Sequence, residues 1–550
     1  MLWNESQSRV GAGRWAFRPA VAWAVALAGL TGLPGPGVGG ELQQLTSGPG
    51  NDTEAAWSPD GKQIVFQSDR QGTLDLYVLD VASKALKPLV EGPGHAAFPA
   101  WSPDGKWIVY SYAHFTKTAF EGIEEGYNLF LVPAEGGAPR RLTQGRYRDY
   151  APVFLPDGKT IWFSSDRGAN EKTNAVSLCA VAVEGGEPKV VLRREGKDHA
   201  AVQASFCADG RSFAYGAIAG FRDNWRIRIA HRDTPEDGYT LTSAQGCFYG
   251  PRWSPSGTLL ACTGFEVGDA GWGVWLLDAR SGQRTRLEAG PGNSRSPAWA
   301  PDGRRLVWEN NRTGAYKLYC TEAPAIPSAA ATVTRPADQK QVLHYSFAER
   351  PGPTVTDLSP QENAGQVHGA PTWLERGLSF AAAGTWIAIP KAKGFDFGAE
   401  PFAVRAVVKP VKNGKLAMIA MGEYEGNRLG WQLYVGEDGR AFFNSRTTDL
   451  QYRGARSHQP LPTSRPVTLT GMRDADGRVR LYVDGDLQQT TAADALYCYG
   501  APIQVRIGTQ YNGSASFPGW IYDLAVFGRE VSPEEARGDA LEWFWAMRSK

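Results

Sequence analysis

Seven residues with side chains able to bind a polar ligand or a metal lie shortly before an aromatic residue that recurs along the chain. They offer carboxylates, imidazoles, a phenol and a guanidinium, and they are Asp52, Glu54, His95, Asp149, His199, Tyr249 and Arg295. Carboxylate and imidazole groups are ligands for divalent metals, and paired carboxylates can cleave a glycoside by acid–base chemistry. Because the seven are far apart in the sequence, they form one site only if the fold brings their segments together.

The recurring aromatic belongs to a repeat with the form "AAWSPDGK" (55–62) or "PAWSPDGK" (99–106). Six copies can be recognised, and their aromatic residues are Trp57, Trp101, Phe154, Phe206, Trp253 and Trp299. The copies follow one another at intervals of 44 to 53 residues, and each contains short apolar runs of strand length separated by turns. A repeat of this length made of strands is typical of a propeller blade. The sequence therefore predicts an all-β fold with a six-bladed β-propeller over residues 41–323.

The sixth copy indicates how the propeller closes. No fourth strand follows "YKLYCTEA" (316–323), whereas "QQLTSGPG" (43–50) has the fourth-strand pattern and precedes the first blade. We expect this N-terminal strand to complete the last blade, because a closed ring leaves no exposed strand edge.

These copies resemble the TolB-type β-propeller family, whose hallmark is a repeat of the form W-S-P-D-G-K-x-I-x-F. The sequence departs from that pattern at Ser256 and at Cys207-Ala208. Asp precedes Gly in most copies, and Asp-Gly is favoured in tight turns in which both residues need a positive φ. We predict turn residues, rather than a ring of functional carboxylates, at Asp60, Asp104, Asp157, Asp209 and Asp302.

The strand order of a propeller places the seven candidate residues. The segments that join the fourth strand of one blade to the first strand of the next lie on the face opposite the Pro-Asp-Gly turns. They lead into the innermost strands, so we expect the seven residues to surround the mouth of the central channel and to bind a ligand. Two alternatives remain: a hydrated funnel with no ligand, and a divalent-metal site of the kind that oligogalacturonate lyases hold with His residues at a propeller centre.

A second β domain is predicted over residues 341–545, after a Pro- and Ala-rich linker at 324–340. Its alternating apolar and polar runs between Gly-rich turns indicate antiparallel strands. The segments "LYVDG" (481–485) and "GWIYDLAVFGREVSPEE" (519–535) resemble the laminin-G-like, concanavalin-A-like family, a jelly-roll β-sandwich.

The family resemblance implies carbohydrate binding, in some members with calcium. The residues that would stack on a sugar are Trp431, Tyr452, Tyr499 and Tyr511, each of which could instead belong to the core or the rim. Asp357 and Asp523 are similar to the calcium-side acids of the family, although calcium prefers six to eight oxygen ligands. We expect no other cofactor.

The first 40 residues have the order of a secretory signal peptide. Arg9, Arg14 and Arg18 precede the apolar run 19–33, and small residues follow it. An uncleaved N-terminal anchor is the alternative. We expect a periplasmic or secreted protein that does not span the membrane after signal cleavage. The near balance of 58 basic and 57 acidic residues argues against nucleic acid as a partner.

We predict no catalytic residue from the sequence, because it lacks a G-x-S-x-G elbow, an H-E-x-x-H motif and a phosphate loop. The favoured hypothesis is therefore an exported, non-catalytic binding or scaffold protein. Its propeller would dock a protein or cell-envelope component, and its jelly roll would recognise carbohydrate. The alternative is a carbohydrate-active enzyme, a lyase or glycosidase, with its active site in the propeller mouth and an accessory sugar-binding domain.

Overall fold

The computed structural model describes the chain from Leu42 to Ala546, with gaps. The residues that it does not describe are 1–41, 114–125, 168–175, 194–199, 219–224, 243–245, 267, 288–289, 325–337, 339, 348–351, 375–376, 383, 399, 412–414, 425–427, 447–451, 493–503, 510–515 and 547–550. The predicted signal peptide and most of the predicted linker therefore lie outside the described residues. The chain forms two compact units that divide after Pro327, apart from two short segments, and each unit is considered by itself.

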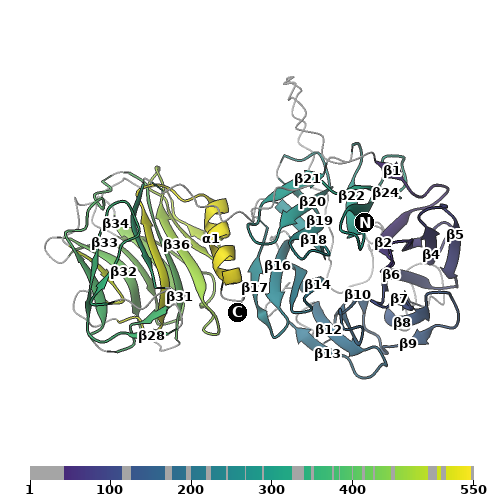
Figure 1. Ribbon diagram of the computed structural model, residues 1–550, viewed down its shortest axis with the longest axis horizontal. Helices are drawn as coiled ribbons and strands as arrows, with labels where there is room; N and C mark the ends of the chain where they lie inside the picture. The colour runs from purple at the N-terminus through teal and green to yellow at the C-terminus, as the bar shows by residue number, and fades with distance from the viewer. Residues whose placement is uncertain are drawn as a thin grey trace, which may run out of the picture. The chain divides into compact units, whose positions relative to one another are not determined.

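Six antiparallel four-stranded sheets form the first unit and confirm the predicted six-bladed propeller (Figure 1). The first three blades, each written from its innermost strand outward, are β2 (Asp52–Trp57), β3 (Gln63–Ser68), β4 (Asp75–Asp80) and β5 (Leu86–Val90); β6 (His95–Trp101), β7 (Trp107–Ala113), β8 (Asn128–Pro133) and β9 (Arg140–Arg141); and β10 (Tyr150–Phe154), β11 (Thr160–Ser165), β12 (Ser177–Ala182) and β13 (Lys189–Leu192).

The last three blades follow the same order. They are β14 (Ala200–Phe206), β15 (Ser212–Ile218), β16 (Arg226–His231) and β17 (Thr234–Thr240); β18 (Gly246–Trp253), β19 (Leu259–Glu266), β20 (Gly273–Asp278) and β21 (Arg284–Leu287); and β22 (Ser294–Trp299), β23 (Arg305–Asn310), β24 (Lys317–Glu322) and β1 (Gln43–Gln44). The innermost strands β2, β6, β10, β14, β18 and β22 lie nearest the centre of the ring in Figure 1.

The ring closes as the sequence predicts. Strand β1 pairs with β24 in antiparallel register, with Gln43 opposite Cys320 and Gln44 opposite Tyr319. The N-terminal strand therefore supplies the outer edge of the last blade, and the first and last parts of the propeller share one sheet.

The Pro-Asp-Gly turns hold their Asp side chains in local hydrogen bonds. In the first blade, Asp60 Oδ1 accepts from Ser58 Oγ at 2.6 Å and from the Lys62 amide at 3.0 Å, and the Gly61 amide donates to the Ser58 carbonyl. These bonds confirm that the Asp is a turn residue. The predicted turn geometry is wrong, because only Gly61 has a positive φ (71°). The pattern is typical of a type I turn followed by a left-handed Gly.

The turn glycines also join neighbouring blades. A Cβ placed on Gly105 would lie 3.7 Å from the ring of Pro59 in the preceding blade, and one on Gly61 would lie 3.3 Å from Pro301. The second of these contacts links the last blade to the first. The repeat thus encodes both the hairpin turn and the packing of one blade against the next.

Two eight-stranded antiparallel sheets form the second unit and confirm the predicted sandwich. The first contains β28 (Thr372–Leu374), β29 (Gly377–Ser379), β40 (Trp520–Phe527), β31 (Phe402–Lys409), β36 (Val467–Arg473), β37 (Val479–Val483) and β38 (Asp486–Thr490), with β25 (Gln341–Ser346) paired to β40. The second contains β26 (Thr354–Val355), β27 (Gly365–His368), β30 (Trp386–Pro390), β39 (Gln504–Ile507), β32 (Ala417–Tyr424), β33 (Arg428–Val435), β34 (Ala441–Arg446) and β35 (Tyr452–Arg456).

One core lies between these two sheets and includes Tyr345, Val404, Ile419 and Phe443, all fully buried. The helix α1 (Pro533–Ala546) follows β40. Its start is encoded by "SPEE" (532–535), because the Glu535 amide donates to Ser532 Oγ and proline is favoured at the first helical position. Within the described residues, no helix has both the length and the hydrophobicity needed to cross a bilayer.

Candidate functional site

Asp52, predicted to face the channel mouth, is instead buried at the start of β2. Its carboxylate accepts hydrogen bonds from Ser68 Oγ at 2.7 Å and from Arg70 Nη2 at 2.6 Å. Lys317 Nζ from the last blade lies 3.3 Å from its second oxygen. The side chain has no exposed surface. These contacts correct the prediction that Asp52 binds a ligand, because protein donors already occupy both oxygens.

Asp149 repeats this arrangement in the third blade. Ser165 Oγ donates to it at 2.7 Å, and Arg167 Nη2 lies 2.7 Å from its other oxygen. In the sixth blade the same positions hold an uncharged pair, in which Asn310 Nδ2 donates to Ser294 Oγ. The arrangement recurs in three blades with and without charge, so it stabilises the blade and the prediction for Asp149 is corrected in the same way.

A β-bulge lies in the middle of every innermost strand, three residues before the aromatic of the repeat. The bulge residue has a φ between 49° and 61° in all six blades, and the six residues are Glu54, Phe98, Ala151, Gln203, Gly250 and Ser296. The amide of the bulge residue bonds a side chain of the preceding blade in three places, for example Ser296 to Thr263 Oγ1 at 2.8 Å. In these three blades the bulge therefore adds a hydrogen bond to the preceding blade, in the middle of the innermost strand.

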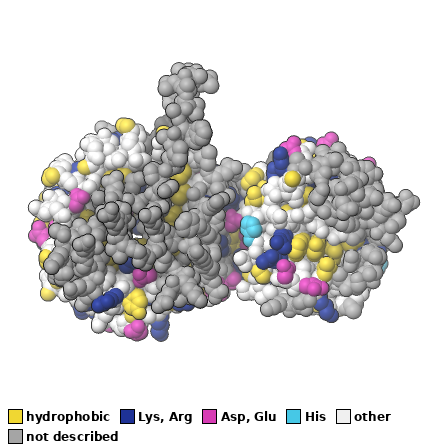
Figure 2. Space-filling view, turned by 180° about the vertical axis from the view of Figure 1, so that it is seen from behind, with side chains coloured by type: hydrophobic (Ala, Val, Ile, Leu, Met, Phe, Trp, Pro, Cys, Tyr) yellow, Lys and Arg dark blue, Asp and Glu magenta, His cyan; other side chains and the backbone are white. Residues whose placement is uncertain are grey.

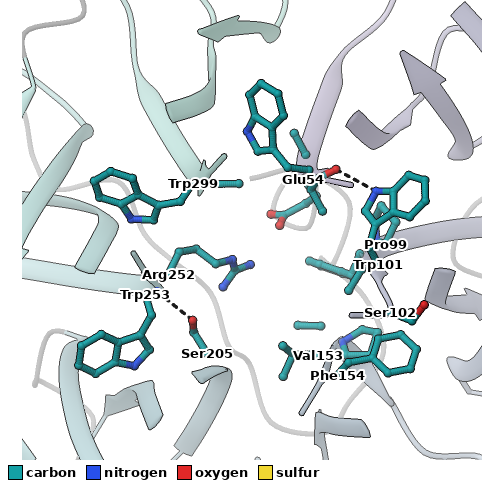
Figure 3. Close-up of a pocket in the computed structure, with 18 of the residues that line it drawn as sticks. Glu54, Pro99, Trp101, Ser102, Val153, Phe154, Ser205, Arg252, Trp253 and Trp299 are labelled. Atoms are coloured by element: carbon teal, nitrogen blue, oxygen red, sulfur yellow. Dashed lines mark hydrogen bonds between the residues drawn. The ribbon is translucent and has the colours of Figure 1, made fainter. Parts of the chain in front are cut away.

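The channel contains a cavity of about 280 Å³ between the bulges and the Pro-Asp-Gly turns (Figure 3). We call it the channel cavity. Its walls are largely Ala, Pro and aromatic residues, among them Trp57, Trp101, Phe154, Trp253 and Trp299. The charged residues in its lining are Glu54 and Arg252, whose side chains point toward the centre of the ring in Figure 3.

Neither of these two charges is neutralised by an ion pair within the described residues. Glu54 Oε1 accepts a hydrogen bond from Ser296 Oγ at 3.0 Å, and Arg252 Nη1 donates to its neighbouring carbonyl, that of Pro251, at 3.1 Å. Burial lowers the pKa of Arg252, and the negative charge of Glu54 acts in the opposite direction. The two groups thus influence each other across the channel without direct contact.

A second group of polar side chains lies on the mouth side of the bulges, where Tyr249 and Arg295 each come one residue before a bulge residue. We call it the mouth cluster, and it consists of Tyr249, Arg295, Glu309 and Tyr316. Glu309 is 1% exposed, and Arg295 Nη2 lies 3.3 Å from its Oε2. Burial raises the pKa of Glu309 to about 7, Arg295 opposes this rise, and the charge of Glu54 adds to it. The pKa of Glu309 is thus shifted toward neutral pH, the direction that suits a general acid or base.

An aromatic ring packs against Arg295 in the mouth cluster. Its guanidinium lies 3.9 Å from the centre of the Tyr316 ring, a cation–π contact. The ring of Tyr249 packs edge-on against Trp272, with centroids 5.3 Å apart. Burial raises the pKa of the Tyr249 hydroxyl, so this side chain remains a neutral hydrogen-bonding group. The structure brings the predicted residues Glu54, Tyr249 and Arg295 into one region.

In the second domain, Trp431 does not have the predicted position of a sugar-stacking residue. It is fully buried in the core between the sheets, where its ring lies parallel to that of Phe395. A sugar stacks on an exposed aromatic face, so this prediction is wrong. Tyr499 and Tyr511, and the side chain of Tyr452, lie outside the described residues.

The two predicted calcium-side acids are engaged by protein groups. Asp357 accepts hydrogen bonds from the amides of His344, Ser359 and Asn363. Asp523 lies 3.2 Å from Arg405 Nη2 and 3.0 Å from His344 Nε2. Within the described residues, no three His, Cys, Asp or Glu side chains gather into a set that could hold a metal. Calcium binding at these two acids stays a prediction, and their contacts give each of them a structural role.

The outward face of the second sheet carries an aromatic group that the sequence did not single out. The rings of His368 and Trp386 stack with centroids 4.1 Å apart and an angle of 8°, and the Arg506 guanidinium lies 4.3 Å from the Trp386 ring centre. All three side chains are half-buried, on adjacent strands β27, β30 and β39. On the face of this domain visible in Figure 2, hydrophobic side chains lie beside charged ones.

Comparison with protein families agrees with this geometry. The model of the TolB beta propeller domain matches residues 38–121 and 74–241, and the model of the concanavalin A-like lectin/glucanase superfamily matches residues 381–537. The chain joins a TolB-type propeller to a concanavalin-A-like domain.

Relatives of the TolB-type propeller are distant. An uncharacterized protein of Agrobacterium fabrum is 26% identical over 46% of this chain and 82% of its own length. The crystal structure of TolB from Acinetobacter baumannii is 21% identical with a TM-score of 0.38, over 46% of this chain and 59% of that one. That of oligogalacturonate lyase from Vibrio parahaemolyticus is 14% identical with a TM-score of 0.37, over 52% and 94%. Both similarities concern the fold alone.

The two histidines predicted for the mouth of the TolB-type propeller, His95 and His199, do not belong to the mouth cluster. His95 begins β6 and is half-buried, and burial lowers its pKa. His199 lies outside the described residues. The cysteines at 179, 207, 247, 262 and 320 are buried free thiols.

Sequence reasoning missed Arg252 and Glu309, although the TolB-type repeat contains the signal for both. One residue before the aromatic, five blades have Ala, Val or Ser and the fifth blade has Arg252. Ten residues after it, five blades have Gln, Ser, Gly or Thr and the sixth blade has Glu309. The charged exceptions become visible when the copies are aligned on the aromatic.

Proposed function

We propose that this protein is an exported binding protein. In this proposal, the TolB-type propeller docks a protein or another cell-envelope component at the channel mouth, and the concanavalin-A-like domain recognises carbohydrate. Export rests on the signal-like order of residues 1–40.

One observation carries the proposal for the propeller. Four positions of the repeat face the channel or its mouth, and each is charged in only one of the six blades. These exceptions are Glu54, Arg252, Arg295 and Glu309, and they come from the first, fifth and sixth blades, which are neighbours in the closed ring. The sister blades keep the same fold with uncharged residues there, so the fold does not require these charges.

Desolvation supports the same conclusion. Burying a carboxylate costs free energy unless it is fully paired, and Glu309 Oε1 is buried without a hydrogen-bond partner within the described residues. Tyr and Arg residues are enriched among those that contribute most to protein interfaces. The mouth cluster combines both residue types with an acid, which is suited to a protein partner that carries complementary polar groups.

Site-specific photo-crosslinking in the native cell tests protein docking. A photoreactive side chain at Tyr249 should give a discrete adduct, whereas the same group at Lys106, on the Pro-Asp-Gly face, should not. The additional change Arg295→Gln should reduce the Tyr249 adduct. Equal labelling from both faces, or none from Tyr249, would exclude docking at the mouth.

Carbohydrate recognition rests on the group formed by His368, Trp386 and Arg506. The half-buried indole of Trp386, with the Arg506 guanidinium over its ring, offers both an apolar surface and hydrogen-bond donors, which is the combination that sugar recognition uses. Glycan-array binding by the full-length chain should be lost in Trp386→Ala and retained in Leu487→Ala, an exposed position on β38. If the wild-type chain binds no glycan, this half of the proposal fails.

A catalytic alternative is favoured by one specific observation. Glu309, with its pKa near 7, lies close enough to Glu54 for the second charge to raise that pKa further. A pair of carboxylates in one site is what glycoside cleavage needs. An enzyme should release reducing ends or unsaturated sugars from a polysaccharide panel, and both Glu54→Gln and Glu309→Gln should abolish this. Glycan binding without product from any substrate would leave the binding function alone.

A further inference from the structure

The channel cavity has a composition that points to a small ligand of its own, separate from docking at the mouth. Its lining combines one carboxylate, Glu54, and one guanidinium, Arg252, with walls of Ala, Pro and aromatic residues. The two hydroxyls in the lining already have partners, because Ser102 Oγ donates to Asp104 and Ser205 Oγ accepts from the Trp253 amide. Besides the indole N–H groups of Trp57, Trp253 and Trp299, which are buried without a partner, the two charges are the polar side-chain groups that the wall leaves to a ligand.

The walls offer few backbone donors at the level of the bulges. Proline follows the bulge residue in four of the six blades, at positions 99, 152, 251 and 297, and proline has no N–H. A ligand carboxylate in this ring would therefore find its strongest donors on Arg252. That guanidinium has five N–H groups and makes one hydrogen bond within the described residues, to the Pro251 carbonyl.

Glu54 also faces the cavity, from the first blade, which one blade separates from that of Arg252. The bulge fixes its backbone at a φ of 51°, and the Ser296 hydroxyl donates to Oε1. The hydrogen bond from Ser296 engages Oε1 of Glu54, and Figure 3 shows the carboxylate and the Arg252 guanidinium both directed into the cavity. An opposite-charge pair that shares a cavity without touching is an arrangement that a bridging ligand completes.

We propose that the channel cavity binds a small zwitterion, a free α-amino acid or a dipeptide. Its ammonium group pairs with Glu54, its carboxylate pairs with Arg252, and its side chain packs on the Ala, Pro and Trp wall. The cavity volume of about 280 Å³ lies just below the usual range for drug-sized ligands, which suits a molecule of this size. A ligand with a single charge would leave one of the two groups buried and uncompensated.

Calorimetric titration of the full-length protein with alanine, Ala-Ala and Ala-Ala-Ala tests the proposal. At least one of them should bind. Acetylating its amino group or amidating its carboxyl group should each weaken binding about tenfold or more, because each change removes a charge-assisted hydrogen bond. These blocked ligands test the charges on the wild-type chain and need no variant to fold.

Variants then assign each end of the ligand. In Glu54→Gln, acetylation should no longer matter, while amidation should still weaken binding. In Arg252→Gln, the reverse should hold. The matched controls are Asp104→Asn and Arg304→Gln in the exposed Pro-Asp-Gly turns, which should bind like the wild type.

Three outcomes would overturn the proposal. They are no binding by any of the three zwitterions, blocked ligands that bind as well as free ones, and unchanged selectivity in both channel variants. Crosslinking from Tyr249 can succeed or fail independently of these titrations, so a failure here is distinguishable from a failure of docking at the mouth.

Discussion

The Pro-Asp-Gly turns and the channel lining are built from the same repeat, yet they treat charge in opposite ways. In the first blade, Asp60 is exposed and accepts two hydrogen bonds from its own turn. Glu54 lies six residues earlier in the same repeat, faces an apolar cavity and has no cationic partner in contact within the described residues. A carboxylate that bonds its own turn belongs to the scaffold, whereas one left without a partner in a cavity is available to a ligand.

A third kind of charge occurs at the start of the innermost strand, at the end away from the turn. Asp52 is as buried as any residue in the protein, but Arg70, Ser68 and Lys317 satisfy it fully. Burial alone therefore does not distinguish scaffold from site. The distinction depends on whether the partners of the charge belong to the protein.

Replacing Asp52 should have the largest effect on stability. Asp52→Asn leaves Lys317 and Arg70 buried beside a neutral group, and breaking a buried ion pair typically costs about 3–5 kcal/mol. Urea denaturation of the propeller should show this loss. A change below about 1 kcal/mol would mean that Asp52 is not a scaffold charge and that the comparison with Glu54 fails.

Glu309 should make stability depend on pH. Its pKa is raised to about 7 by burial, against 4.5 for a free Glu side chain. Below pH 4.5 both states hold the proton, and above pH 7 both have released it, so stability falls as pH rises between these values.

The difference between the two pKa values of Glu309 corresponds to about 3 kcal/mol. Glu309→Gln should remove this pH-dependent loss, so the variant gains stability relative to the wild type as the solution passes from acid to slightly alkaline. Glu322→Gln, at an exposed position on β24, should show no such trend. Parallel denaturation profiles for wild type and Glu309→Gln would contradict a raised pKa.

The turn glycines should show a moderate effect. Gly61→Ala places a side chain at a φ of 71°, which costs about 1–2 kcal/mol, and it also presses a Cβ against Pro301. Gly72→Ala at a φ of 95° has no atom within 4 Å, so it reports backbone strain alone. Thermal unfolding should show the greater loss for Gly61→Ala. Equal losses would mean that the Pro–Gly contact between blades adds nothing.

The smallest effect is expected at the turn carboxylates. Asp104→Asn keeps an oxygen that can accept from Ser102 Oγ and the Lys106 amide, so stability should change by less than about 0.5 kcal/mol. The two hydrogen bonds, Ser102 first, hold the pKa of Asp104 below its usual value. A loss above 1 kcal/mol on denaturation would show that these turns depend on charge.

The sequence was sufficient for the fold because the signals were local and repeated. Trp57 and its counterparts count the blades, and residues 43–50 indicate the closure that the pairing of Gln43 with Cys320 confirms. The turn type was predicted incorrectly because Asp-Gly occurs both in turns with two left-handed residues and in type I turns followed by Gly. The proline before the Asp favours the second.

The candidate site was only partly predictable. The strand order placed Glu54, Tyr249 and Arg295 near the channel, but it could not separate them from Asp52 and Asp149. The Ser and Arg partners of these two acids lie at the end of the second strand and in the loop that follows it. In "SDR" (68–70 and 165–167), the Ser and Arg that engage each Asp are present in the sequence. Their pairing becomes evident only once the strands are in register. The burial of Trp431 likewise depends on which face of β33 is inward.

The closure of the last blade by β1 also determines when the propeller can finish folding. Its outer edge comes from residues 43 and 44, while the strand that receives them ends at Glu322, so the ring stays open until nearly the whole domain has been synthesised. Contacts of such long sequence separation form slowly, and an open ring exposes strand edges to other chains. Strand β1 has only two residues, both exposed, so other contacts between the first and last blades also hold the ring closed, among them the buried Lys317–Asp52 ion pair. Nascent chains are therefore expected to aggregate most readily before this closure.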